Sequence, residues 1–263
     1  MNVSVENLDK KWFASIINFY FFELFNSILF TFVSIMTTAL LNLQQIDLLL
    51  FCLIRALTLY YSLYGLSNKY FHFINPSFLI AFSLINKNKN TNNWLVLSSQ
   101  FVGSVIGGSL GVLYLLSSEL NKKSLSFIIT VSHFEKIDIE FSTLWIDTIF
   151  ISLLTFSFLI CRQRGKNDLT IIAMVSFLCD FMTVIFSGGY PYFWATLVEI
   201  FHTSSFNRLA SNKLFASLFG GIGGYFIYTG INGNSIYKKK KKALTANFEM
   251  TESIKNNISN NPN

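Results

Sequence analysis

The sequence predicts an all-α membrane protein in which six transmembrane helices and two re-entrant half-helices form an inverted repeat. Hydrophobic residues fill 52% of the 263 positions and charged residues only 13%, against roughly 25% charged residues in soluble domains. Apolar runs of about 18 residues or more, the length of a membrane span, recur along the chain. Two shorter apolar stretches each begin at a proline and occupy matching places in the two halves.

Six segments are long and apolar enough to cross a hydrocarbon core of roughly 30 Å. They cover residues 12–41, 47–66, 94–118, 141–161, 169–187 and 214–231. The stretches 76–85 and 191–201 are too short to cross as helices. We expect them to be re-entrant half-helices, which are tolerated only where protein or a water-filled cavity covers their free ends.

The predicted organisation follows from these segments. It consists of a cytosolic segment at 1–11, a first repeat at 12–118, an extracytosolic loop at 119–140, a second repeat at 141–231, and a basic, disordered cytosolic tail at 232–263. The predicted cytosolic side holds thirteen Lys and Arg residues and the other side holds five. This bias favours an orientation with both termini in the cytosol.

The two halves carry matching features. Glu23 lies in the first span and Asp147 lies at the matching place in the fourth, while Pro76 and Pro191 begin the two short stretches. Each half has three spans and one half-helix. An odd number of crossings makes the repeat inverted, and such repeats place their broken helices near the midplane.

Glycines recur at similar distances from the two prolines. Gly103 follows Pro76 by 27 residues and Gly220 follows Pro191 by 29. The third span holds Gly103, Gly107 and Gly111, and the sixth holds Gly220, Gly221, Gly223 and Gly224. Glycine at this spacing lets helix backbones approach closely, so we expect the third and sixth spans to pack at the centre.

The Asn75-Pro76-Ser77 segment is the most informative motif. Proline suits the first position of a helix, because its fixed φ fits the helix and its missing N–H has no partner there. The Asn75 amide offers donors beside the positive end of that helix. In so apolar a chain, this predicts a short helix that begins inside the membrane and points its N-terminus at a polar group.

These features resemble the aquaporin and glycerol-facilitator family, the major intrinsic proteins. Glu23 lies in a Phe-Glu-Leu-Phe-Asn-Ser-Ile-Leu-Phe-Thr-Phe segment, Asn75-Pro76-Ser77 is similar to the first Asn-Pro-Ala box, and Gln100 and Gly103 lie in Ser-Gln-Phe-Val-Gly-Ser-Val-Ile-Gly. The resemblance covers about residues 12–231 and is that of a divergent, unorthodox member. It implies a passive channel for water and small neutral solutes such as glycerol, assembled as a homotetramer in a lipid bilayer without a cofactor.

The second Asn-Pro-Ala box is absent, and two segments compete for its place. Ser187-Gly188-Gly189-Tyr190-Pro191-Tyr192 keeps the proline, whereas Asn207-Arg208-Leu209 keeps the asparagine. Spacing favours the first, since Asn207 is only 13 residues from Gly220. The predicted constriction therefore comprises Asn75, Pro76, Ser77, Tyr190, Pro191 and Tyr192, and Phe193 or Trp194 lies near the place of the family's constriction arginine.

Ionisable residues inside spans are usually functional or paired. For Glu23 and Asp147 we favour a structural role, in which each carboxylate accepts hydrogen bonds from the adjacent half-helix loop, over direct contact with a solute. Asp180 is a third acid, in the fifth span. Arg55 either lines the passage and sets selectivity in place of the missing arginine, or pairs with an acid inside the membrane.

Nothing in the sequence indicates an enzyme, a metal site or a nucleic-acid partner. It contains no phosphate-binding loop and no nucleophile elbow, and its three cysteines lie in apolar segments without metal-ligand spacing. Two alternatives to the channel remain: a non-conducting scaffold or regulatory membrane protein, and an ion-coupled carrier that uses Glu23, Asp147 and Asp180.

Overall fold

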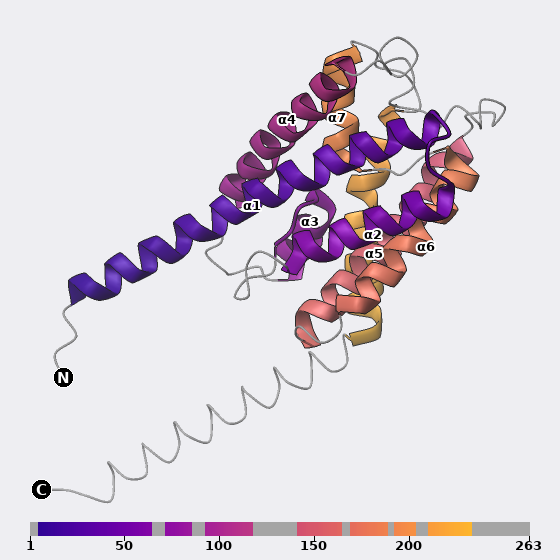
Figure 1. The fold of residues 1–263 in the computed structure, drawn as a ribbon. Coiled ribbons are helices and arrows are strands. Elements are labelled where there is room, and N and C mark those ends of the chain that lie inside the picture. Colours follow the sequence, from indigo (N-terminus) through magenta and orange to yellow (C-terminus); the bar gives the residue numbers. More distant parts are fainter. Residues whose placement is uncertain are drawn as a thin grey trace, which may run out of the picture. The chain divides into compact units, whose positions relative to one another are not determined.

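The computed structural model describes residues 5–64, 72–85, 93–117, 141–164, 169–188, 192–203 and 210–232. Every regular element in these ranges is an α-helix (Figure 1). The helices are α1 (Val5–Asn42), α2 (Leu48–Tyr64), α3 (Pro76–Ile85), α4 (Asn93–Ser117), α5 (Phe141–Arg164), α6 (Leu169–Ser187), α7 (Phe193–Thr203) and a last helix, Ala210–Asn232. The predicted 119–140 loop and the tail from 233 onward lie outside the described ranges. The chain divides into two units, Met1–Tyr225 and Phe226–Asn263.

Five of the described helices are long and apolar enough to cross a membrane. These spans are Ile17–Asn42, Asn93–Ser117, Thr143–Gln163, Thr170–Ser187 and Ala210–Asn232. The chain is therefore a multi-pass integral membrane protein. The predicted second span corresponds to α2, whose 17 residues rise about 26 Å at 1.5 Å per residue, somewhat less than a hydrocarbon core of roughly 30 Å.

A tight turn joins α1 to α2. Gln44 adopts a left-handed conformation with φ of 58°, which reverses the chain just after the helix, as at many helix C-termini. Asp47 then caps α2, because its Oδ1 accepts a 2.6 Å hydrogen bond from the Leu50 N–H. Local chemistry thus accounts for the boundary between the first two helices.

The glycines join the third span of each half to the first span of that half. In the first half, α4 lies along α1 (Figure 1), and Cβ atoms added at Gly103 and Gly107 would collide with the backbone oxygens of Leu24 and Ile28. In the second half, glycines of the last helix meet Ile151, Ser152 and Thr155 of α5. We had expected these glycines to pack the third and sixth spans together, but most of the close approaches that they permit lie within each half, and Gly221, the exception, approaches Ser77 of α3.

We predict that Gly107→Ala destabilises the fold, since the Ile28 carbonyl that the new Cβ would strike belongs to the backbone and cannot rotate away. Overpacking of this kind typically costs about 1–3 kcal/mol. Denaturant unfolding of the purified protein in detergent measures the effect. Gly230→Ala is the matched control, because a Cβ there meets nothing within 4 Å; equal unfolding midpoints for the two variants would contradict the prediction.

Candidate functional site

The first short helix, α3, begins at Pro76. Asn75 is its N-cap: its carbonyl accepts hydrogen bonds from Phe78 (3.1 Å) and Leu79 (3.4 Å), and its Oδ1 accepts the Ser77 N–H at 3.2 Å. This is the usual arrangement for an asparagine cap followed by proline at the first helical position. Both Asn75 and Ser77 are buried, so the end of this helix lies inside the protein.

The second short helix, α7, begins at Phe193. The Tyr192 carbonyl accepts the first helical hydrogen bond, from the Thr196 N–H at 3.0 Å, so Tyr192 occupies the capping position that Asn75 has in α3. Gly220 follows Phe193 by 27 residues, the same interval that separates Gly103 from Pro76. The counterpart of Asn75 is thus Tyr192, two residues later than we expected from Pro191. Tyr190 and Pro191 lie outside the described ranges.

One hydrogen bond links the residues that precede the two short helices. The Tyr192 hydroxyl donates a 3.1 Å hydrogen bond to the carbonyl oxygen of Ile74, the residue just before the α3 cap. Ile74 has a φ of 58°, which is rare for a β-branched side chain and indicates a backbone held in place by its surroundings. Sequence reasoning did not identify Ile74, because a left-handed isoleucine has no signature in the sequence.

Glu23 holds this backbone. Its carboxylate is fully buried and accepts hydrogen bonds from the N–H groups of Phe73 (3.1 Å) and Ile74 (2.8 Å). Gln100 Nε2 donates to Glu23 Oε1 at 2.7 Å, and His72 Nδ1 lies 3.0 Å from Oε2. These contacts are those of a structural carboxylate that ties α1 to α4 and to the loop before α3.

Asp147 lies beside the other loop. It accepts a hydrogen bond from the Ser187 hydroxyl, and Ser187 is the last residue of α6. The next residue, Gly188, has a φ of 72°, a conformation that glycine adopts readily. Asp147 therefore binds the point at which the chain leaves α6 toward α7, although the 189–191 stretch is not among the described residues.

The last helix closes around the Asn75 cap. Ser77 Oγ donates to the Ser217 carbonyl at 2.5 Å, and Ser217 Oγ donates to Asn75 Oδ1 at 3.2 Å. Gly221 permits this approach, since a Cβ there would lie 2.7 Å from the Ser77 carbonyl oxygen. The Asn75 amide oxygen is thereby fully engaged, whereas its amide nitrogen donates to none of the described residues. That N–H₂ group remains available as a donor.

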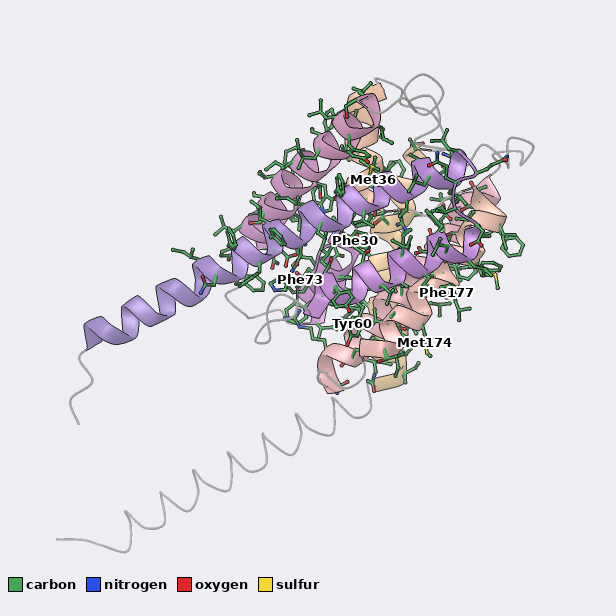
Figure 2. The ribbon with its side chains drawn as sticks, viewed as in Figure 1. Phe30, Met36, Tyr60, Phe73, Met174 and Phe177 are labelled. Atoms are coloured by element: carbon green, nitrogen blue, oxygen red, sulfur yellow. The ribbon has the colours of Figure 1, made fainter. Side chains whose placement is uncertain are left out.

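Aromatic side chains from the α3 segment pack against α5. Phe78 and Phe158 stack with ring centroids 4.4 Å apart, and Phe73, labelled in Figure 2, lies 6.0 Å from Phe158. All three rings are buried. The Arg162 guanidinium covers the Phe73 ring at 4.5 Å, a favourable cation–π geometry. These rings therefore form a packed aromatic cluster between the α3 segment and α5.

A buried ion pair lies close to Tyr192. The Tyr192 ring contacts Phe30 edge to face at 4.5 Å, and Arg55 lies over Phe30 at 5.8 Å. Arg55 Nε is 3.3 Å from Asp180 Oδ2, and both side chains are almost fully buried. Of the two roles left open for Arg55, these contacts show the pairing with an acid inside the membrane.

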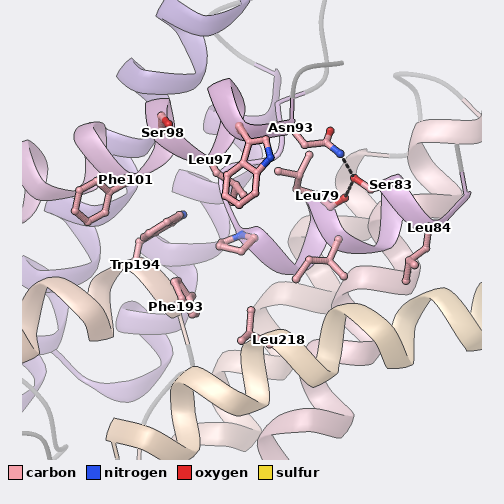
Figure 3. A pocket seen from close by; sticks show the side chains of 13 residues that line it. Leu79, Ser83, Leu84, Asn93, Leu97, Ser98, Phe101, Phe193, Trp194 and Leu218 are labelled. Carbon is pink, nitrogen blue, oxygen red and sulfur yellow. Dashed lines mark hydrogen bonds between the residues drawn. The ribbon is translucent and has the colours of Figure 1, made fainter. Parts of the chain in front are cut away.

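Phe193 and Trp194 lie beside a lateral cavity of about 690 Å³ that Pro76 also lines (Figure 3). The indole N–H of Trp194 donates a 3.0 Å hydrogen bond to Gln100 Oε1, and Gln100 in turn binds Glu23. A chain of hydrogen bonds thus links the first turn of α7 to the loop before α3. The sequence motif identified Gln100 as a candidate residue but did not predict its hydrogen bond to Trp194.

The described side chains include no group of three or more His, Cys, Asp or Glu that could hold a metal ion, and Cys52, Cys161 and Cys179 are buried and form no disulfide bond. No protein-family model matches the chain, and no curated protein is significantly similar to it. The class that fold and site define is an all-helical, multi-pass membrane protein in which one hydrogen bond links the starts of two short helices.

Proposed function

We propose that this protein is a passive transmembrane channel for water and small neutral solutes such as glycerol, built from six spans and two half-helices as an aquaporin-like inverted repeat. The observation that carries the proposal is the hydrogen bond from the Tyr192 hydroxyl to the Ile74 carbonyl. It links the starts of α3 and α7, and in the proposed channel the positive ends of these two short helices point toward one passage. Such a field opposes the passage of cations and protons.

Internal symmetry supports the inverted repeat. Residues at matching places on the first spans of the two halves, α1 and α5, are 124 positions apart in the sequence. This holds for Glu23 and Asp147, and for two pairs that contact glycines, Ser27/Ile151 and Ile28/Ser152. The glycines that contact these pairs lie on the third spans of the two halves. Gly103 and Gly220 are 117 positions apart, and so are Gly107 and Gly224. One constant offset on each helix is what duplication of a single packing arrangement produces. The proposed fold counts α2, the second span along the chain, together with the five longer ones. Because α2 is short, it can cross the membrane only with some thinning of the bilayer or a shift of its flanking residues.

Asn75 supplies the chemistry that a water channel needs. Its amide oxygen is held by Ser77 and Ser217, which fixes the orientation of the side chain. The free amide nitrogen then offers a hydrogen-bond donor at the convergence of the two helix ends. A passing water or hydroxyl oxygen accepts from this donor, which turns the molecule and interrupts a continuous proton-conducting chain. Tyr192 offers no second amide, so we expect weaker selectivity for water.

Partnerless polar atoms in the interior also favour a hydrated path. The Asn26 amide, His72 Nε2 and Thr155 Oγ1 are buried and have no hydrogen-bond partner among the described residues. Each such group costs about 1–3 kcal/mol when left unpaired. Water molecules crossing the protein would satisfy these groups, as buried waters commonly do.

The aromatic packing favours the second candidate function, a non-conducting aquaporin-like scaffold or regulatory membrane protein. Phe78 stacks on Phe158 and Phe30 packs against Tyr192, so buried aromatic rings lie close in sequence to both short-helix starts and would close a passage there. An ion-coupled carrier has less support, because Glu23 and Asp180 are both engaged by the contacts described above. The resemblance further leads us to propose a homotetramer with both termini in the cytosol.

Stopped-flow shrinkage of proteoliposomes tests the channel. We expect water permeability above that of empty vesicles with a low activation energy, a smaller glycerol permeability, and no dependence on a proton gradient. Asn75→Ala should reduce water permeability, because it removes the orienting donor, whereas Asn42→Ala at the end of α1 should not.

Removing an aromatic ring separates a closed channel from a scaffold. If the wild-type protein matches empty vesicles but Phe158→Ala conducts water, the protein is a channel in which stacked rings close the passage. If both match empty vesicles while the purified protein remains folded, the channel proposal is wrong and the scaffold stands. A rate that follows an imposed proton gradient would favour the carrier.

A further inference from the structure

The lateral cavity of about 690 Å³ lies among α3, α4, the start of α7 and the last helix (Figure 3). Its volume falls within the roughly 300–1,000 Å³ of ligand-binding pockets. The Asn75 side chain does not line it, so the cavity is separate from the donor assigned to the channel.

Two of the three polar side chains on the cavity wall lie together at one end. They are Ser83 of α3 and Asn93 at the start of α4, while Ser98 lies further along α4, nearer Phe101 (Figure 3). Asn93 Nδ2 donates to Ser83 Oγ at 2.9 Å, as Figure 3 shows. The remaining lining is proline, leucine, isoleucine, phenylalanine and tryptophan. A site with a polar pair at one end and a long, mostly apolar body matches an amphiphile.

The cavity opens on the lipid-facing surface of a spanning helix. Trp94 is 78% exposed, and Phe101 and Leu84 are also exposed; all three line the cavity. Trp94 and Phe101 belong to α4, one of the five membrane-length helices, so their exposed side chains are placed to contact lipid, and Trp94 near the start of α4 suits the membrane–water interface. The cavity therefore continues the surface that contacts lipid, where hydrocarbon rather than water is the available filler.

The buried part of the cavity reaches the first residues of the two short helices. Pro76 and Trp194 line it, and Trp194 is only 6% exposed. Through its indole N–H, Trp194 is linked by Gln100 to Glu23, the carboxylate that holds the loop before α3. A molecule bound in the cavity would therefore contact Pro76, the first residue of α3, and Trp194, which is linked to the loop before α3.

We propose that this cavity binds one acyl chain of a bilayer phospholipid, with the ester region near Ser83 and Asn93 and the chain running inward to Trp194. The bound chain packs against the outer faces of α3 and α7 and supports the convergence of their N-termini. This inference goes beyond the proposed channel function, because it does not require that anything passes through the protein.

Quenching of tryptophan emission by brominated lipid tests the proposal. Trp12, Trp94 and Trp145 are replaced by phenylalanine, so that Trp194 is the one remaining tryptophan of four. The protein is reconstituted in phosphatidylcholine vesicles with bromine at successive positions along the acyl chain. Although Trp194 is buried, we expect it to lose most of its emission, and the loss should be greatest for bromines far from the headgroup.

Blocking variants distinguish the cavity from general contact with lipid. Ser98→Phe, or Leu79→Phe if the first does not fold, fills the cavity and should restore Trp194 emission. Val102→Phe, on an exposed part of α4 outside the cavity, should leave the quenching unchanged. A second protein that retains only Trp94 serves as a positive control. Its emission should be quenched with and without the blocking substitutions, which shows that the brominated chains reach this surface.

Two results would overturn the proposal. If Trp194 keeps its emission in brominated vesicles while Trp94 is quenched, no acyl chain enters, and another occupant such as a second copy of the chain covers the cavity. If Ser98→Phe and Leu79→Phe leave the quenching as strong as Val102→Phe does, the bromines reach Trp194 by another route. Neither result depends on water permeability, so failure here leaves the channel test unaffected.

Discussion

Replacing Glu23 by leucine is expected to prevent stable folding. The substitution would leave four buried donors without their acceptor: the N–H groups of Phe73 and Ile74, Gln100 Nε2 and His72 Nδ1. Each buried donor left unpaired costs about 1–3 kcal/mol, and their combined effect is comparable with the roughly 5–15 kcal/mol stability of a typical domain. Size-exclusion chromatography in detergent and denaturant unfolding measure the loss.

A conservative variant and a matched control define the effect. Glu23→Gln keeps one acceptor oxygen and should be destabilised less than Glu23→Leu. Asp47→Ala removes an exposed carboxylate that caps α2, and loss of such a cap typically costs about 0.5–2 kcal/mol. If Glu23→Leu unfolds at the same denaturant concentration as Asp47→Ala, the carboxylate does not organise the loop before α3.

Removing one member of the Arg55–Asp180 pair is expected to have the second-largest effect. Asp180→Leu leaves the Arg55 charge buried without its acidic partner, since the two side chains are 4% and 1% exposed. Breaking a buried pair in this way costs about 3–5 kcal/mol, whereas replacing both members by apolar residues is often neutral. We therefore expect Asp180→Leu to be strongly destabilised and the double variant Arg55→Leu/Asp180→Leu to regain most of the loss.

A double-mutant cycle checks this prediction. Unfolding free energies are measured for the wild type, both single variants and the double variant. A large coupling energy supports a structural ion pair, and Arg55→Leu should then leave the ratio of water to glycerol permeability unchanged in any molecules that fold. Additive destabilisation, or a changed permeability ratio with normal stability, would instead place Arg55 at the selectivity-determining position.

The first short helix was predictable because its signals are local. Proline at the first position and asparagine before it specify a helix start, and α3 occupies the predicted residues, Pro76–Ile85. The second short helix begins two residues later than Pro191 indicated. Tyrosine is not among the preferred capping residues, so the sequence around Tyr192 carried no signal for the cap that its carbonyl forms with Thr196.

The partners of buried polar residues could not be read from the sequence. Arg55 and Asp180 are 125 positions apart, and Ser217 and Asn75 are 142 apart. Glycine content predicted close helix packing but not which helices meet, because a glycine permits approach without selecting a partner. The structure pairs Gly107 with Ile28, and Gly224 with Thr155, within each half.

By itself, the sequence determined the membrane class, five of the spans, the position of α3 and the residue types at its cap, because hydropathy, helix length and proline geometry act over a few turns of chain. Only the tertiary structure decided that Tyr192 reaches the Ile74 carbonyl, that Glu23 holds the loop before α3, and that Arg55 is paired with Asp180. These contacts join segments far apart in sequence. Their energies come from burial and hydrogen-bond geometry, which exist only after the helices have packed.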